Sequence, residues 1–194
     1  MSSFSFSILI ALFSFTAILR LFELIKANRN YRNRIAEEGL QYPKENYFFL
    51  FIVLHLSFLI LTPLEVYFFQ REFIFLLGIA MFFIYILCLF LRFHILKVLG
   101  KNWNTKVIVN PENEASIVTD GIYNYIRHPN YLIVILEIFS LSLFHSAYIS
   151  FIIFSILNII ILFFRIRFEE NLLFMNIKYK EHFYRKKRFI PGIF

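Results

Sequence analysis

FIFLLGIAMFFIYILCLFLRFHIL, residues 73–96, is the stretch of sequence that decides the fold class. It carries a single formally charged side chain, Arg92, within a run of Phe, Ile and Leu. About 20 apolar residues are enough for a helix to cross the hydrocarbon core of a bilayer, which is ~30 Å thick. The stretch therefore predicts a transmembrane helix.

Two similar stretches precede it in the sequence. Residues 47–69 predict another span, and residues 70–72, which join the two, are too few for anything but a tight hairpin. The opening segment, residues 4–25, is apolar over about 20 residues with no Lys or Arg before it, which favours a retained membrane anchor over a signal peptide. Residues 26–46 are polar, and we expect a loop there.

A longer apolar run, residues 132–164, follows the hydrophilic stretch of residues 100–128. As one helix with a rise of 1.5 Å per residue this run would be about 50 Å long, which is too long for a single crossing. We therefore expect two short spans that meet near His145–Ala147. The tail, residues 165–194, is basic, and its first half is amphipathic.

The predicted architecture is an all-α, polytopic membrane helix bundle with about five spans, forming one domain over residues 1–194. Three spans belong to residues 1–98, and the long loop, a helical hairpin and the tail belong to residues 99–194. The composition agrees, since 59% of residues are hydrophobic and 17% are charged, whereas about 25% are charged in soluble domains. The single cysteine, Cys88, excludes a disulfide framework.

The charge distribution predicts the orientation in the membrane. The chain has 20 Lys and Arg against 13 acidic residues, a net charge of +7. The basic residues flank apolar runs, which argues against nucleic acid as a partner and for a role in topology. Arg71 is the only one expected on the far side of the bilayer. We therefore expect the N-terminus outside and the long loop and tail in the cytoplasm.

Polar side chains gather before the fourth predicted span and after the fifth. If these spans form a hairpin, the Arg127–Pro129 segment lies beside Arg165 and the Glu169–Glu170 pair. Pro129 suits the first position of a helix, where its missing N–H costs nothing, and that helix N-terminus would favour an anionic group such as a carboxylate. Arg165 and Glu169 are four residues apart and share a helix face. These features predict a charged pocket at the membrane surface.

Each of these residues also has a purely structural interpretation. Arg127 and Arg165 are equally typical of flanking residues whose long side chains reach the interface, and Trp103 is typical of an interfacial aromatic belt. Glu65 and Glu137 lie inside predicted spans, where ionisable residues are candidates for function. Pairing with an arginine or a backbone group for packing is the alternative for both.

Three sequence motifs, in a fixed order along the chain, resemble those of a known family. They are LGKNW at residues 99–103, GIYNYIRHPNY at residues 121–131 and RIRFEENLL at residues 165–173. Together they resemble the isoprenylcysteine carboxyl methyltransferase family, and the resemblance covers roughly residues 99–189.

The resemblance implies an integral membrane methyltransferase that uses S-adenosylmethionine, held by the loop, the last two spans and the tail, with no metal ion. The positions that match the family's cofactor contacts are Tyr123, Arg127, His128, Pro129, Tyr131 and Glu170. Arg165 and Glu169 match its residues near the reacting group, and we assign them the catalytic roles. Glu169 is the candidate base, and Arg165 would stabilise the anionic oxygen of the acceptor.

The N-terminal half resembles the bacterial branch of the family, which includes O-methyltransferases of alkylpyrones and phenolic lipids. The motifs are Arg20–Leu24, Arg29–Asn30, Glu38–Gly39, Tyr42–Pro43 and Leu54–His55. We therefore expect a lipophilic acceptor that enters from the membrane lipids, with no obligatory protein partner. The resemblance to the bacterial branch also implies that the protein lies in a bacterial inner membrane.

Two alternatives to this function stay open. One is a carboxyl methyltransferase of the isoprenylcysteine type. The other is a non-catalytic scaffold or small transporter, with a polar path through Arg20, Glu65 and Glu137.

Overall fold

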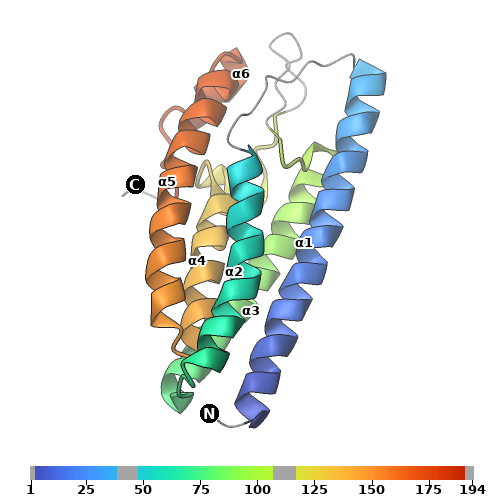
Figure 1. Cartoon of the computed structure of the whole chain (residues 1–194). Helices are drawn as coiled ribbons and strands as arrows, with labels where there is room; N and C mark the ends of the chain where they lie inside the picture. The colour runs from blue at the N-terminus through green and yellow to red at the C-terminus, as the bar shows by residue number, and fades with distance from the viewer. Residues whose placement is uncertain (1–2, 39–47, 107–116, 191–194) are drawn as a thin grey trace.

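The computed structural model describes residues 3–38, 48–106 and 117–190, and over these residues the chain is all-α, as predicted (Figure 1). The α-helices are α1 (Ser3–Glu38), α2 (Phe48–Phe68), α3 (Phe75–Leu99), α4 (Pro129–Phe144), α5 (Tyr148–Leu173) and α6 (Ile177–Phe183). Among the described residues between α3 and α4 are the short 3₁₀ helices η1 (Gly100–Asn102) and η3 (Gly121–Asn124).

Four of these helices, α1, α2, α3 and α5, are long and apolar enough to cross a bilayer, which indicates a multi-pass membrane protein. Helix α4 is apolar but has only 16 residues, about 24 Å at the usual rise. It lies between α3 and α5 and packs most extensively along α3. The expected fifth span is therefore a shorter helix inside the bundle.

The break in the long apolar run falls where it was expected. Helix α4 ends at Phe144, α5 begins at Tyr148, and Ser146 between them has a positive φ of 55°. The two helices are not both short, however, because α5 continues for 26 residues to Leu173.

The expected loop over residues 26–46 is wrong in its first part. Helix α1 runs on to Glu38, because residues 26–38 contain neither Gly nor Pro and their inner face has partners. Asn30 donates hydrogen bonds to the carbonyl oxygens of Gly100 and Trp103, at 3.1 and 2.8 Å. Residues 39–46 lie outside the described part of the chain.

The helices pack tightly at one end of the bundle and separate at the other. Near the tight end Phe58 of α2 contacts Phe13 of α1 and Phe154 of α5, with ring centroids 5.5 and 5.3 Å apart. At this end Glu65 accepts hydrogen bonds from the N–H groups of Ile149 and Ser150 at the start of α5. Toward the other end α1 leans away from α2 (Figure 1).

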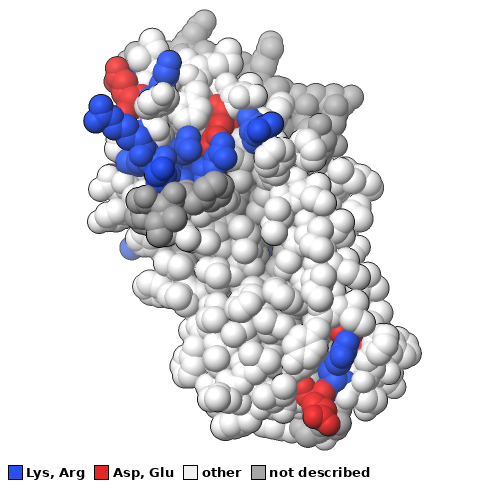
Figure 2. All heavy atoms as spheres, turned by 90° about the vertical axis from the view of Figure 1, so that its left-hand side faces the viewer, with Lys and Arg blue, Asp and Glu red and all other residues white. Residues whose placement is uncertain are grey.

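Charged side chains are also distributed unevenly between the middle of the bundle and its two ends. On the face drawn in Figure 2, the middle of the bundle is almost free of Lys, Arg, Asp and Glu, and these gather at the two ends. A wide apolar belt between charged ends is what a bilayer requires of a spanning protein.

Candidate functional site

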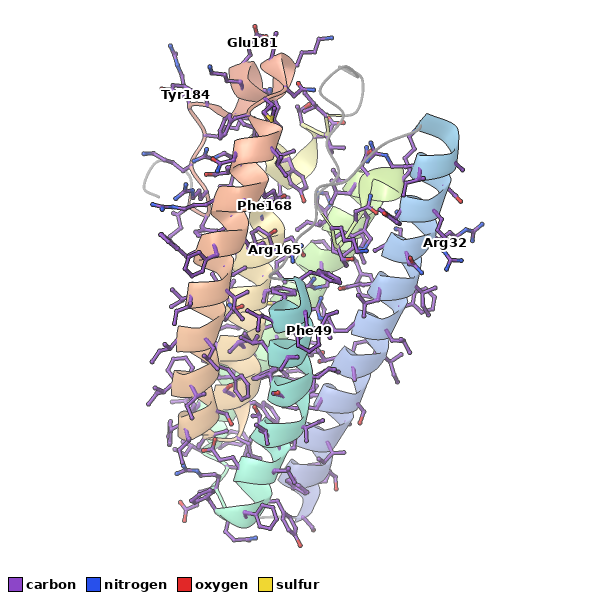
Figure 3. The ribbon with its side chains drawn as sticks, turned by 45° about the horizontal axis from the view of Figure 1, so that its top comes forward. Arg32, Phe49, Arg165, Phe168, Glu181 and Tyr184 are labelled. Carbon is purple, nitrogen blue, oxygen red and sulfur yellow. The ribbon has the colours of Figure 1, made fainter. Side chains whose placement is uncertain are left out.

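A cavity of about 320 Å³ occupies the end of the bundle where the helices separate. Its wall combines the start of α2 and α4, the ends of α3 and α5, the middle of α1 and the segments between α3 and α4. Figure 3 shows Arg165 pointing inward from α5, whereas Arg32 of α1 points away from the bundle. The two stretches that flank the α4–α5 hairpin thus meet at one site, as the sequence predicted.

The Arg127–Pro129 segment is held in place by the tail. The backbone N–H groups of Arg127 and His128 donate to the carbonyl oxygens of Lys187 and Arg188, each at 3.0 Å. Pro129 begins α4, the position the sequence predicted for it. The start of α4 is therefore fixed by a segment almost 60 residues later in the chain.

Glu170 is the centre of an ion-pair cluster behind the cavity wall. Its Oε1 atom lies 3.1 Å from Nε2 of His128 and 3.2 Å from Nη1 of Arg127, and its Oε2 atom accepts from Nη2 of Arg188 at 2.6 Å. The bonds to Glu170 also raise the pKa of the Arg188 guanidinium. This carboxylate joins α4, α5 and the tail in one unit.

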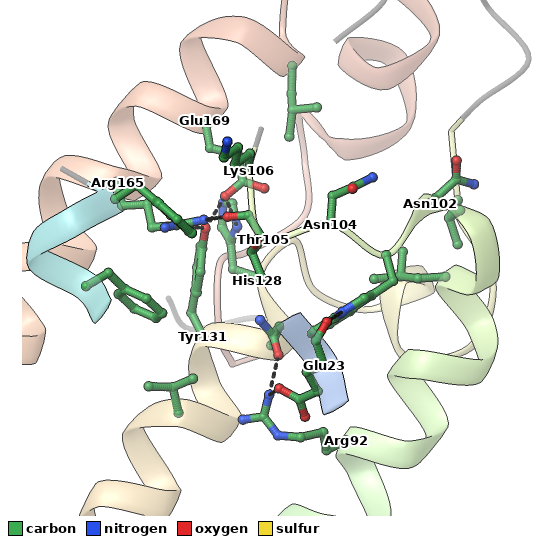
Figure 4. Close-up of a pocket in the computed structure, with 18 of the residues that line it drawn as sticks. Glu23, Arg92, Asn102, Asn104, Thr105, Lys106, His128, Tyr131, Arg165 and Glu169 are labelled. Carbon is green, nitrogen blue, oxygen red and sulfur yellow. Dashed lines mark hydrogen bonds and ion pairs between the residues drawn. The ribbon is translucent and has the colours of Figure 1, made fainter. Parts of the chain in front are cut away.

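A second set of polar contacts lies directly on the cavity (Figure 4). The hydroxyl of Tyr131 donates to Oε2 of Glu169 at 2.5 Å and accepts from Nε of Arg165 at 2.8 Å. Nη2 of Arg165 donates to the carbonyl oxygen of Thr105, and its guanidinium lies 4.9 Å from the ring centroid of Phe51. Arg165 is therefore fixed on several sides, so its charge and the carboxylate of Glu169 are pre-organised.

Two tyrosines on the cavity, both outside the spans, remain hydrogen-bond donors at neutral pH. Burial raises the pKa of Tyr123, which lines the cavity, and the negative charge of Glu169 raises it further. Burial likewise raises the pKa of Tyr179, at the tail side of the same cavity. Both phenols are protonated at physiological pH and suit an anionic or carbonyl oxygen.

Six of the eight residues predicted for the site line the cavity, and the remaining two support it from behind. Pro129 and Glu170 are the two behind the wall. The residues on the cavity are Tyr123, Arg127, His128, Tyr131, Arg165 and Glu169. A direct contact of Glu170 with a cofactor stays a prediction, and its visible role is to hold His128 and Arg127.

Sequence reasoning missed a second polar cluster in the wall, formed by Arg20 and Glu23 of α1, Arg92 of α3 and Glu137 of α4. Arg92 donates from Nε and Nη2 to the two oxygens of Glu137, at 3.1 and 2.8 Å, and Arg20 also contacts Glu137. Glu137 is therefore paired for packing, the alternative that the sequence left open. In the sequence, the only indication of this cluster is that its charged residues lie inside apolar runs.

Several polar atoms in the wall are buried without a hydrogen-bond partner in the described residues. Asn104 leaves both its Oδ1 and its Nδ2 unpaired, Arg127 leaves Nε, and Glu23 leaves Oε1. Buried polar atoms normally have partners, so unpaired ones in the wall of a cavity agree with a site that a ligand completes. The cavity volume also lies within the ~300–1,000 Å³ of small-molecule sites.

These features define a polytopic α-helical membrane protein with a charged, partly apolar ligand cavity at one end of its bundle. Over residues 78–175 the sequence matches the model of the isoprenylcysteine carboxyl methyltransferase (ICMT) family. The chain therefore belongs to this family, whose members depend on S-adenosylmethionine.

Two relatives extend the match along the chain. An uncharacterized protein of Bacillus subtilis (strain 168), YpbQ, is 32% identical over 157 residues, which cover 80% of this chain and 90% of the relative. An uncharacterized protein of Haemophilus influenzae is 28% identical over 158 residues, covering 79% of this chain and 87% of the relative. The similarity to these relatives thus extends beyond residues 78–175.

Proposed function

We propose that the protein is an S-adenosylmethionine-dependent O-methyltransferase that acts on the hydroxyl group of a lipophilic acceptor, such as an alkylpyrone or a phenolic lipid. One observation carries the proposal. The six predicted site residues that line the cavity face the same space as apolar side chains of α2, including Phe51, Ile52, Leu56 and Leu59. A single space thus offers a charged part for the cofactor and an apolar part for the acceptor.

The residues on the cavity fit the cofactor's chemistry. S-adenosylmethionine carries a carboxylate, a ribose and an adenine ring, which need cationic, hydroxyl and amide partners. Arg127 and the N-terminus of α4 suit the carboxylate, and the phenols of Tyr123 and Tyr131 suit polar oxygens. Asn104, with an unpaired donor and an unpaired acceptor, suits the edge of a base or the ribose.

The protein itself contributes a base and an anion-stabilising group to the proposed reaction. When bound, S-adenosylmethionine supplies a sulfonium methyl group, whose carbon–sulfur bond breaks with its electron pair going to sulfur as the acceptor oxygen attacks. Glu169 takes the proton from the acceptor hydroxyl. The guanidinium of Arg165 stabilises the negative charge that develops on that oxygen, and Tyr131 keeps the two groups aligned.

Arg165 also supports the second candidate, a carboxyl methyltransferase of the isoprenylcysteine type. A guanidinium beside an apolar channel suits a lipid carboxylate as well as a phenolate. A carboxylate acceptor needs no base, however, whereas Glu169 is placed on the cavity with one oxygen engaged by Tyr131. This arrangement favours an acceptor that must lose a proton.

The charges inside the bundle favour a transporter less. Glu65 is paired with Arg71 at 2.8 Å and caps α5 at the tight end, whereas Arg20 and Glu137 are paired with each other near the cavity. The three residues of the polar path that a transporter would use therefore belong to two separate clusters. We also propose that the cavity faces the cytoplasm, because Lys and Arg are concentrated in the tail that covers it.

The proposal is tested by titrating the purified full-length protein in detergent with S-adenosylhomocysteine in a calorimeter. We expect saturable heat for the wild type, and none or at least tenfold weaker binding for His128→Ala. Arg185→Gln, an exposed change in the tail, is the control and should bind normally. Lipids from cells that express the wild type should gain a species heavier by one methylene, absent with His128→Ala. No heat from a folded wild type would end the proposal.

A further inference from the structure

After α6 the tail folds back along the outside of α5. Phe189 packs against the buried cluster of Tyr131, Leu162 and Ile166, so residues 184–190 return from α6 to the place where the apolar run of α5 ends. This segment lies on the α5 side of the bundle, away from α1 (Figure 1). It therefore runs beside a spanning helix at the edge of the apolar belt.

The side chains of this segment divide between two faces. Nζ of Lys186 donates to the carbonyl oxygen of Tyr123 at 3.3 Å, and Arg188 pairs with Glu170, so both side chains point inward, as does Phe189. The remaining side chains are exposed, and they are Tyr184, Arg185, Lys187 and Ile190.

Arg167 of α5 shows where this outer face meets the lipid. Its guanidinium lies 4.3 Å from the ring centroid of Phe163, one turn earlier on α5, and that ring is 49% exposed. An exposed phenyl ring on a spanning helix lies against lipid, and an arginine beyond it reaches the headgroups. Arg167 also follows Ile166, a member of the cluster that Phe189 contacts. The tail surface is defined here as the exposed side chains of Arg167, Tyr184, Arg185, Lys187 and Ile190.

The tail surface combines unpaired cations with apolar side chains. Its three cations form no ion pair with a described acid, and residues 174–190 as a whole hold six Lys and Arg against one acid. Tyr184 is 70% exposed and Ile190 is 48% exposed. Figure 2 draws this side of the molecule, and its Lys and Arg gather at the edge of the apolar belt. Cations interspersed with apolar side chains are typical of segments that bind a membrane surface.

We propose that the tail surface docks on the headgroups of anionic phospholipids in the adjoining leaflet. Lipid is the occupant because the surface continues the lipid-facing side of α5, and a soluble partner would have to displace the lipid that covers Phe163. The charge selects the headgroup, since each Lys or Arg near an anionic membrane surface strengthens binding by about fivefold. The inference goes beyond the proposed function and does not depend on it.

Lipid on the tail surface acts on the cavity through the backbone of the same segment. The carbonyl oxygens of Lys187 and Arg188 accept hydrogen bonds from the N–H groups of Arg127 and His128, each at 3.0 Å. A ligand that binds the ordered form of a segment stabilises that form. Anionic lipid outside the tail therefore stabilises the wall of the cavity inside it.

Hydrogen exchange of the backbone amides tests the inference without cofactor or turnover. The full-length protein is placed in nanodiscs of phosphatidylcholine, with or without phosphatidylglycerol. We expect phosphatidylglycerol to slow the exchange of Arg127, His128 and residues 184–188 by at least about threefold, and high salt to remove this difference. Residues 69–72, in the hairpin at the other end of the bundle, should exchange equally in both lipid mixtures.

Two triple variants locate the effect. The first replaces the three cations of the tail surface, as Arg167→Gln, Arg185→Gln and Lys187→Gln. It should exchange like the wild type in phosphatidylcholine and lose the response to phosphatidylglycerol. The matched control removes the same charge at exposed positions of α1 and α3, as Arg29→Gln, Arg32→Gln and Lys97→Gln. This control should keep the response.

Equal exchange of the wild type in the two lipid mixtures would overturn the inference, as would the same response in both triple variants. Slower exchange with soluble polyglutamate, and not with phosphatidylglycerol, would assign the surface to an acidic protein and overturn it as well. The wild-type comparison and its salt dependence need no variant, so a variant that fails to fold does not remove the test. A lipid response without binding of S-adenosylhomocysteine would remove the proposed function alone.

Discussion

The hydroxyl of Tyr131 donates to Oε2 of Glu169 at 2.5 Å, although the two residues are 38 positions apart in the sequence. The same hydroxyl accepts from Nε of Arg165, so it connects the carboxylate and the guanidinium across the cavity wall. The bond orients the carboxylate of Glu169, which lines the cavity. The relationship brings the proposed base, Glu169, and the proposed anion-stabilising group, Arg165, together around one hydroxyl.

Replacing Glu169 by Gln should separate the two kinds of acceptor. A phenol or an enol must lose its proton, and we expect its methylation rate to fall about 10²–10⁴-fold, the usual contribution of a general base. A carboxylate acceptor is already ionised, and its rate should fall less than about tenfold. Initial rates with an alkylphenol and a long-chain carboxylate measure the difference, with Glu181→Gln, a change at an exposed position of α6, as the control. Full activity with both acceptors would remove Glu169 from the mechanism.

Replacing Tyr131 by Phe should lower kcat more than it changes the KM of the acceptor. The ring keeps its packing, but Glu169 and Arg165 lose the hydroxyl that aligns them, and misaligned catalytic groups typically cost about tenfold or more in rate. Steady-state kinetics with a phenolic acceptor give the two constants. A rise in KM at constant kcat would instead make Tyr131 a binding residue only.

The positions of the spans follow from hydropathy, but the end of α1 does not. The apolar run ends near Ile25, whereas the helix continues to Glu38. Hydropathy indicates where an apolar environment ends along the chain, and a helix can continue beyond that point. The bonds from Asn30 to Gly100 and Trp103 that support the extension connect residues at least 70 positions apart, and no local pattern announces them.

The candidate site was predictable where its residues sit in short motifs. The Arg127–Pro129 segment and the Glu169–Glu170 pair carry their own signal, and the turn between α4 and α5 brings them together. The cluster around Glu23 was not predictable, because its ion pairs join α1 to α3 and α4 across 69 to 117 positions. Sequence alone shows that such charges lie within apolar runs, and not which of them are left unpaired.

Glu170 and Arg188 should behave as one coupled unit. Glu170→Gln removes the negative charge that holds Arg127, His128 and Arg188, so we expect at least tenfold weaker binding of S-adenosylhomocysteine and faster tryptic cleavage of the tail. Arg188→Gln should do the same to a smaller extent, since its side chain is 33% exposed. The double variant should lose less than the sum of the two, because both changes break the same contact. Strict additivity in calorimetry and cleavage rates would show that the tail is held elsewhere.

Glu65 should contribute to stability and not to activity. It accepts hydrogen bonds from the N–H groups of Ile149 and Ser150, at 3.2 and 2.6 Å, and pairs with Arg71. Glu65→Gln leaves one of these donors without an acceptor and should cost about 1–2 kcal/mol, a fall of about 2–8 °C in Tm for a chain of this size. Arg71→Gln keeps the cap and should lower Tm less. Both variants should bind S-adenosylhomocysteine normally in the calorimeter, because the cap lies at the tight end of the bundle, and weakened binding at an unchanged Tm would place Glu65 in the functional site.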